Sequence, residues 1–245
     1  MNFDKIIAVR TGKTVYKDGD RAVKVFDSDY LKSDILNEAL NQARAEESGL
    51  NVPNLISVDG ENGRWAIASR YISGKTVARI ITETPENTND ILERFVDIQL
   101  FFQSRKAPLM TALKSKAERR IALAEVSEIK RKKLLSLLDT LPDGDSLCHC
   151  DFTPSNVIAA DDGTLYVLDW SHASHGDAAA DAAATYLRIK FADEEGARRY
   201  LSLYCEKSGK NRRDIEKWLP VVAAAVSVGK SAEERNFMLN SVKIN

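Results

Sequence analysis

Apolar and polar positions alternate along much of the first quarter of the chain, which is the pattern of half-buried β-strands. In the segment 21–26, Val23 and Val25 should face one way, while Lys24 shares the opposite face with a small residue and an aromatic. This lysine is either an edge-strand residue that opposes aggregation or a functional cation. Further short strands are expected near residues 6–9, 14–16, 55–58 and 65–71.

Apolar residues recur at helical spacing through most of the remaining chain. One helix is expected early, from an N-cap at Ser33 to Ser48, with Gly49 as its left-handed stop. Beyond residue 74 the pattern predicts helices over 88–104, 110–124, 127–139, 178–191, 194–208, 212–229 and 231–241. Strands followed by helices are typical of the α+β class. We therefore expect a small β-rich lobe (1–73), a hinge near 69–74, and a larger helical lobe (74–245).

One predicted hairpin interrupts the helical part and carries most of the chemical information. Asn156 precedes an apolar run, an Asp-Asp-Gly turn and a second apolar run that ends before Asp169. Because an Asp-Gly hairpin returns the chain to its start, Asp169 should end beside Asn156, with Asp151 five residues upstream. Such oxygen donors suit a Mg²⁺ ion that keeps several waters and shares the phosphates of a substrate. The pattern therefore indicates phosphoryl transfer.

The overall composition excludes several classes of protein. The 245 residues carry a net charge of −1 and 44% apolar residues, so we expect neither a nucleic-acid nor a membrane partner. The N-terminal segment has charges within its apolar stretch and does not resemble a signal peptide. Three cysteines, two of them separated by one residue, do not make a disulfide framework. A cytoplasmic protein with a small-molecule partner is the expectation.

The predicted hairpin also carries a family resemblance. His149-Cys150-Asp151, followed by Asn156 and Asp169, resembles the H-G-D-x-x-x-x-N and I/L-D-W motifs of the aminoglycoside phosphotransferase and choline kinase group. This group of small-molecule kinases belongs to the protein-kinase-like superfamily, and the resemblance covers nearly the whole chain. It implies a bilobal kinase-like fold that uses ATP and Mg²⁺. It also implies Asp151 as catalytic base, Asn156 and Asp169 as metal ligands, and His149 as a support for the loop.

The resemblance extends to the first quarter of the chain. Ala22-Val23-Lys24-Val25 resembles the V-A-I-K strand of kinases. This likeness implies that Lys24 pairs with the α- and β-phosphates and that Glu38, on the following helix, holds it by an ion pair. In the matched hinge, the Arg70 carbonyl and the Ile72 amide would make the backbone contacts to adenine.

Three positions depart from the family pattern or need an assignment. The segment Arg10–Thr14 lacks G-x-G-x-x-G, and it is no Walker A loop, because Ile7 occupies the place of the upstream glycine. Cys150 replaces the usual glycine, which is there either for a backbone angle closed to other residues or only for space. We expect the second reason, which makes cysteine harmless. Asp177, matching the G-D-P aspartate of the family, is expected to brace the catalytic loop.

These features predict an ATP- and Mg²⁺-dependent phosphotransferase that modifies a hydroxyl group of a small molecule. The alternative is a nucleotide-binding pseudokinase with a regulatory or scaffolding role. The acceptor, meaning the molecule that receives the phosphoryl group, stays open between an aminoglycoside-like compound, an amino alcohol and a sugar. A polycation would need acids, with candidates at Asp181, Asp193 to Glu195, Glu206, Glu233 and Glu234. Choline would need an aromatic cage, with candidates at Trp170, Tyr186, Tyr200, Tyr204 and Trp218.

Overall fold

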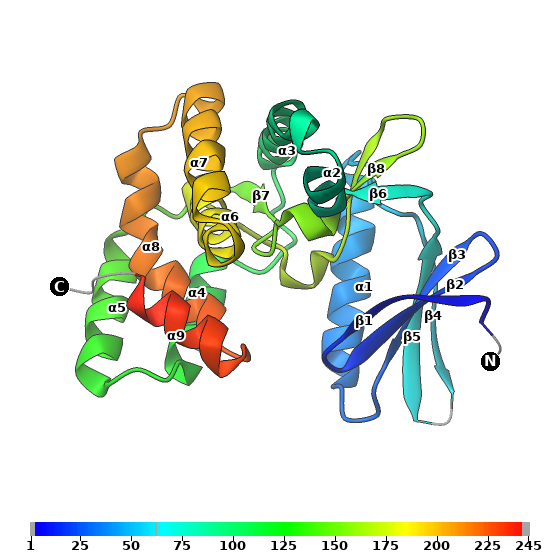
Figure 1. Ribbon diagram of the computed structural model, residues 1–245. Coiled ribbons are helices and arrows are strands. Elements are labelled where there is room, and N and C mark those ends of the chain that lie inside the picture. Colours follow the sequence, from blue (N-terminus) through cyan, green and yellow to red (C-terminus); the bar gives the residue numbers. More distant parts are fainter. Residues whose placement is uncertain (1–2, 62, 242–245) are drawn as a thin grey trace. The chain divides into compact units, whose positions relative to one another are not determined.

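The structure is a computed structural model that describes residues 3–61 and 63–241 (Figure 1). The chain divides into two compact units, which are described separately. Unit 1 comprises Met1–Glu83 and Ser155–His172, and unit 2 comprises Thr84–Pro154 and Ala173–Asn245. These bounds differ from the expected division at residue 73, because the strand after the hinge pairs with the predicted hairpin. Among the described residues, none of the helices has both the length and the apolar composition to cross a membrane.

Unit 1 contains a five-stranded antiparallel sheet in the order β1-β2-β3-β5-β4. The strands are β1 Lys5–Arg10, β2 Lys13–Asp18, β3 Arg21–Phe26, β4 Leu55–Glu61 and β5 Arg64–Arg70. In the register of the central strands, Lys24 lies opposite Val15 on β2 and Ile67 on β5. Directly opposite residues point to the same face of a sheet, so this register decides which side chains can meet.

Helix α1 (Lys32–Glu47) lies along one face of this sheet (Figure 1). Its buried Ile35 packs in one apolar cluster with Phe26 and Ile67 of the sheet. Val23 belongs to a separate cluster formed by the opposite face. The alternation predicted for segment 21–26 is therefore confirmed. The helix begins before the predicted N-cap, so that Ser33 lies within its first turn.

A three-stranded sheet completes unit 1, in the order β6-β8-β9. The predicted hairpin is present as β8 (Val157–Ala160) and β9 (Leu165–Val167), and it pairs with β6 (Gly74–Thr76), a strand that sequence analysis did not predict. Gly74 has a φ of +153°, and an added Cβ would lie 2.2 Å from the Ala159 carbonyl oxygen. Glycine is therefore required where β6 approaches β8. Helix α2 (Val77–Glu83) follows directly.

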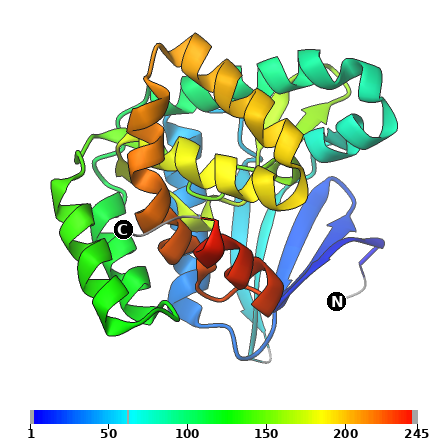
Figure 2. The same cartoon turned by 60° about the vertical axis from the view of Figure 1, so that its left-hand side comes forward.

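Unit 2 is mainly helical. Its helices are α3 Thr88–Gln103, α4 Leu113–Leu123, α5 Glu128–Thr140, α6 Ala178–Ala192, α7 Glu194–Ser208, α8 Arg212–Ser227 and α9 Ala232–Asn240. The seven predicted helices of this part are confirmed, with ends that differ by a few residues. Helix α8 packs against α4, α6 and α9 (Figures 1 and 2). The short strands β7 (Ser146–Cys148) and β10 (Ser174–Gly176) pair with each other beside these helices.

The core of unit 2 is rich in aromatic side chains. Phe95, Phe102, Phe152 and Tyr200 are all fully buried. The rings of Phe95 and Phe152 stack with their centroids 4.1 Å apart. Phe152 directly follows the predicted catalytic Asp151, so the aromatic core anchors the backbone of this loop.

Candidate active site

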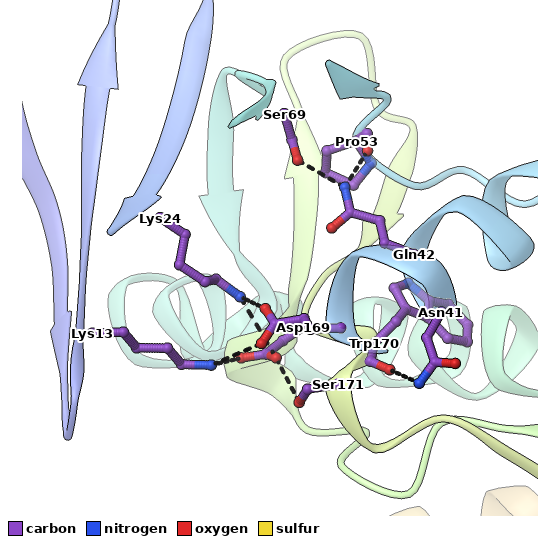
Figure 3. Close-up of polar contacts among 10 residues, drawn as sticks. Lys13, Lys24, Asn41, Gln42, Pro53, Ser69, Asp169, Trp170 and Ser171 are labelled. Atoms are coloured by element: carbon purple, nitrogen blue, oxygen red, sulfur yellow. Dashed lines mark hydrogen bonds and ion pairs between the residues drawn. The ribbon is translucent and has the colours of Figure 1, made fainter. Parts of the chain in front are cut away.

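Two lysines and two acids form a cluster in unit 1 (Figure 3). Lys24 Nζ donates a hydrogen bond to Glu38 Oε1 and lies 3.6 Å from Asp169 Oδ1. Lys13 Nζ donates to Asp169 Oδ2 at 3.2 Å and lies 3.7 Å from Glu38 Oε2. The structure therefore contains the ion pair expected between Lys24 and Glu38. It also adds Lys13, which sequence analysis considered only as part of a rejected Walker A loop.

Strand register explains why the two lysines converge. Lys13 lies opposite Phe26, and Val15 lies opposite Lys24, so both lysines project from the same sheet face on adjacent strands. Gly12, with a φ of +73°, makes the turn that starts β2 directly before Lys13. The alternation along β2 predicts that Lys13 and Lys24 share a face only if the pairing of β2 with β3 is already known.

Burial and charge set the ionisation of this cluster. Glu38 is only 2% exposed, which excludes a role as a surface glutamate without a fixed partner. Burial disfavours the charged form of Lys24, but Asp169 and Glu38 outweigh it and raise the pKa of Lys24. Burial also opposes ionisation of Asp169, whereas Lys24 and Lys13 outweigh it and lower the pKa of Asp169. The shifts of these two pKa values favour the ammonium form of Lys24 and the carboxylate form of Asp169 together.

The hairpin brings residues 156 and 169 to the same end of its strands. Val157 pairs with Val167, and the Leu168 amide donates to the Asn156 carbonyl oxygen at 2.8 Å. Asp169 comes next in the chain, and its Oδ1 accepts a hydrogen bond from Ser171 Oγ at 2.9 Å. A carboxylate and a carboxamide at neighbouring positions are hard oxygen donors, so this pair of residues fits a Mg²⁺ ion that retains waters.

Backbone hydrogen bonds hold the hinge segment. The Arg70 amide donates to the Asn54 carbonyl at 2.9 Å, and the Tyr71 amide donates to the Asp20 carbonyl at 2.7 Å. These bonds use neither the Arg70 carbonyl nor the Ile72 amide, the two groups expected to meet adenine. That contact stays a prediction.

The predicted catalytic loop lies in unit 2. His149 is fully buried, and its Nδ1 accepts a hydrogen bond from the Asp151 amide at 3.2 Å. The imidazole ring also packs against Phe152, so it contacts two of the residues that follow it in the loop. The Asp151 side chain is 22% exposed, and its Oδ1 lies 2.9 Å from Nη1 of Arg188 on α6. Arg188 belongs to no sequence motif, because it is a single arginine in an apolar helix, and it was not among the predicted site residues.

Cys150 corrects one expectation. Its φ is +62°, in the left-handed region that favours glycine. The expectation that the family glycine serves only for space is therefore wrong, because the backbone angle is itself one that cysteine adopts at a cost of about 1–3 kcal/mol. Burial, and then the nearby Asp181, raises the pKa of the Cys150 thiol to about 12. The thiol therefore stays protonated at neutral pH.

Asp181, rather than Asp177, bonds directly to the catalytic loop. Asp181 is 1% exposed, and its carboxylate accepts hydrogen bonds from the Cys150 amide at 2.7 Å and from the side-chain amide of Gln103 at 2.8 Å. Asp177 instead caps α6 through the Ala179 amide at 3.0 Å. The expected brace is thus provided one helical turn later, by Asp181, which the sequence suggested only as an acid for a cationic acceptor.

Comparisons with known proteins agree with this geometry. The sequence model of the phosphotransferase enzyme family matches residues 9–218. No curated protein matches the chain in sequence. The structure is similar to that of choline kinase LicA from Streptococcus pneumoniae, with a TM-score of 0.69 and 18% identity over 98% of this chain and 91% of that one.

Two further solved structures have the same fold. An aminoglycoside-3'-phosphotransferase of type VIII has a TM-score of 0.65 and 17% identity over 91% of this chain and 92% of that one. A choline/ethanolamine kinase family protein from Mesorhizobium loti has a TM-score of 0.68 and 15% identity over 98% and 86%. At these identities the structures show the fold, and the family match over most of the chain shows the chemistry. The chain belongs to the phosphotransferase enzyme family and is an ATP- and Mg²⁺-dependent kinase that acts on a hydroxyl group of a small molecule.

Proposed function

We propose that the residues described above divide the transfer reaction between them. Lys24, held by Glu38, binds the α- and β-phosphates of ATP, and Asn156 and Asp169 hold Mg²⁺. Asp151 accepts the proton of the acceptor hydroxyl. The observation that carries the proposal is the convergence of Lys24, Glu38 and Asp169 in one part-buried cluster.

The chemistry of phosphoryl transfer supports this division. The reaction needs neutralised phosphates and a positioned acceptor, with little covalent help from the protein. Bound Mg²⁺ supplies charge neutralisation at the phosphates. Lys24 adds a fixed positive charge whose position is set by the buried carboxylate of Glu38. Asp151 is held by the buried His149 ring through its own amide, which restricts the directions its carboxylate can take.

Adenine recognition and the division into lobes complete the proposal. The Arg70 carbonyl and the Ile72 amide contact the adenine base, which makes recognition independent of both side chains. Unit 1, which includes the hairpin with Asn156 and Asp169, acts as the nucleotide-binding unit, and unit 2, which carries Asp151, acts as the acceptor unit. We also propose a cytoplasmic location, which the three free cysteines support. The family match gives no support to the pseudokinase alternative.

A pair of substitutions tests these roles. Asp151→Asn should lower the rate of phosphoryl transfer by about 10²- to 10⁴-fold while leaving the Kd for Mg·ADP unchanged, because a general base does not bind nucleotide. Asp169→Asn should instead weaken nucleotide binding that depends on Mg²⁺. Transfer is measured from radiolabelled ATP to the low-molecular-weight filtrate of yeast extract, and binding is measured by calorimetry.

Asp139→Asn is the matched control, because Asp139 is an exposed acid on α5. It should behave as the wild type in both assays. Transfer by Asp151→Asn at the wild-type rate would show that another group takes the proton. An Asp169→Asn variant whose nucleotide affinity keeps its full Mg²⁺ dependence would remove Asp169 from the metal site.

A further inference from the structure

A buried arginine contacts the proposed catalytic base, and its charge has no role in the reaction described above. The Arg188 side chain is only 8% exposed, and it binds Asp151 Oδ1 through Nη1 at 2.9 Å. Its Nη2 lies 3.5 Å from the Cys150 carbonyl oxygen. Its Nε is buried, and among residues 3–61 and 63–241 no hydrogen-bond partner meets it. A buried donor without a partner costs about 1–3 kcal/mol, so this guanidinium has unused capacity for an acceptor of hydrogen bonds.

Helix α4 carries two further cations, Lys116 and Arg120, and the charge of Asp151 acts on both. Arg120 donates from Nε to the Ala225 carbonyl at 2.6 Å and from Nη2 to the Val228 carbonyl at 2.9 Å, which fixes its position. Burial, and then the charge of Arg188, lowers the pKa of Arg120. Burial also lowers the pKa of Lys116, on which Arg120 acts as a neighbouring like charge. These cations disfavour one another, and an additional negative charge would relieve the repulsion.

Asp151 pairs with Arg188, and its charge also acts on Lys116 and Arg120. The other acid at this loop, Asp181, is buried and already accepts hydrogen bonds from the Cys150 amide and from two glutamine side chains. Among the acids suggested for a polycation, Glu195 pairs with Arg198, and Glu234 lies 3.2 Å from Lys230. They therefore belong to ion pairs on helix surfaces.

The aromatic residues suggested for a choline cage have other roles. Tyr200, Tyr204 and Trp218 are fully buried in the core of unit 2. Tyr186 is 9% exposed and already has the Lys190 ammonium 5.8 Å from its ring centroid. A cage needs ring faces open to a ligand cation, so none of these four residues favours a quaternary ammonium.

We infer that the acceptor is an anion, a hydroxylated small molecule with a carboxylate or phosphate group that binds Arg188, with Lys116 and Arg120 adding positive charge. The inference rests on the proposed function of Asp151. The acceptor oxygen forms a bond to the γ-phosphorus, the bond from that phosphorus to the bridging oxygen of ADP breaks, and the hydroxyl proton passes to Asp151. Arg188 lies beside Asp151, so it can hold the anionic group while the carboxylate faces the hydroxyl.

This inference can be tested without knowing the acceptor, by sorting candidate molecules according to their charge. The low-molecular-weight filtrate of yeast extract is divided by ion exchange into cationic, neutral and anionic pools, and each is incubated with radiolabelled ATP. Labelled product should form from the anionic pool with the wild type and not with Asp151→Asn. Product from the cationic or neutral pool instead would overturn the acceptor inference alone. Product from none of them, while Mg·ADP still binds, would contradict the proposed function itself.

Matched compounds then separate the two kinds of anion and the role of Arg188. D-gluconate is compared with D-sorbitol and D-glucamine, and glycerol 3-phosphate with glycerol. The charged acid of the active series should have a kcat/KM about 10- to 100-fold above its neutral partner. Arg188→Gln should raise KM for the anion and remove this preference, and Arg188→Lys should restore part of it. Equal loss of kcat for charged and neutral acceptors would reduce Arg188 to a support for Asp151.

Lys116→Gln tests the same inference independently, in case the Arg188 variants do not fold. It should raise KM for the anionic acceptor several-fold, because the variant loses one partly buried positive charge that attracts the anion. Lys114→Gln is the control, because Lys114 lies on the same helix but pairs with Asp143. An unchanged preference for anions in both the Arg188→Lys and Lys116→Gln variants would contradict the inference.

Discussion

Lys13 and Lys24 reach the same carboxylate from neighbouring strands, at 3.2 and 3.6 Å from the oxygens of Asp169. Mg·ATP brings several negative charges to a site of this kind, so two ammonium groups can share them. The segment Arg10–Thr14 has one glycine, Gly12, in place of the G-x-G-x-x-G motif whose backbone N–H groups cover phosphates. A side-chain cation at the start of β2 can substitute for some of those backbone donors.

Lys13→Met should therefore weaken nucleotide binding. We expect the Kd for Mg·ADP to rise by about tenfold, in line with the loss of one charge-assisted hydrogen bond, and the Kd for AMP to change less. Calorimetric titration measures both constants. Lys5→Met, on the exposed strand β1, is the control and should bind nucleotide as the wild type does. An equal loss of affinity for ADP and AMP would place Lys13 outside the phosphate site.

Cys150→Gly should stabilise the protein. The φ of +62° is accessible to glycine without strain, and the expected gain in the free energy of unfolding is about 1 kcal/mol after the greater entropy of unfolded glycine is subtracted. Urea unfolding measures the change. Cys150→Ala retains Cβ and should give no gain. Similar destabilisation by both variants would mean that packing of the buried thiol outweighs the backbone angle.

The strands and helices that the sequence predicts are those with their own local pattern. The strand Arg21–Phe26 and the hairpin around Gly163 carry alternation and a turn signal, and the structure has both. The three-residue strands β6, β7 and β10 are too short for periodicity and exist only through pairing with distant segments. Lys13 and Arg188 were missed for the same reason, because their partners lie 156 and 37 residues away in sequence.

The pairing of β6 with β8 depends on one glycine. Gly74→Ala should destabilise the protein by about 2–4 kcal/mol, because it combines an unfavourable φ with a close contact to the Ala159 carbonyl oxygen. Gly19→Ala is the control, since Gly19 also has a positive φ, +59°, but an added Cβ would meet no atom within 4 Å. Equal losses in chemical denaturation would show that the contact with β8 is unimportant.

At the scale of the whole molecule, the proposed nucleotide-binding residues and the proposed catalytic base belong to different compact units. Lys13, Lys24, Glu38 and Asp169 lie in unit 1, and Asp151 lies in unit 2. Unit 1 is built from two chain segments, one before and one after residues 84–154. A ligand that binds unit 1 should therefore stabilise both of its chain segments together, although they are distant in sequence.

Hydrogen exchange can measure this coupling. Saturating Mg·ADP should slow amide exchange in β2, β3 and α1 and, to a comparable degree, in β8 and β9, since ligand at about 100 times its Kd adds about 2.7 kcal/mol to the stability of the state that binds it. Helices α7 and α8 should change less. Protection confined to the first chain segment would show that the hairpin opens independently of the sheet.

The two-segment construction of unit 1 also has a consequence for synthesis on the ribosome. The sheet and α1 emerge first, but β6 has no partner until the hairpin has been translated, about 90 residues later. At translation rates of about 5–20 residues per second, this interval lasts roughly 5–20 s. During this interval, the edge of β6 and the surface of α1 that contacts Trp170 in the folded protein are exposed to the nascent chain and to chaperones. We expect slower translation of residues 84–154 to lengthen this interval and so to lower the yield of folded enzyme.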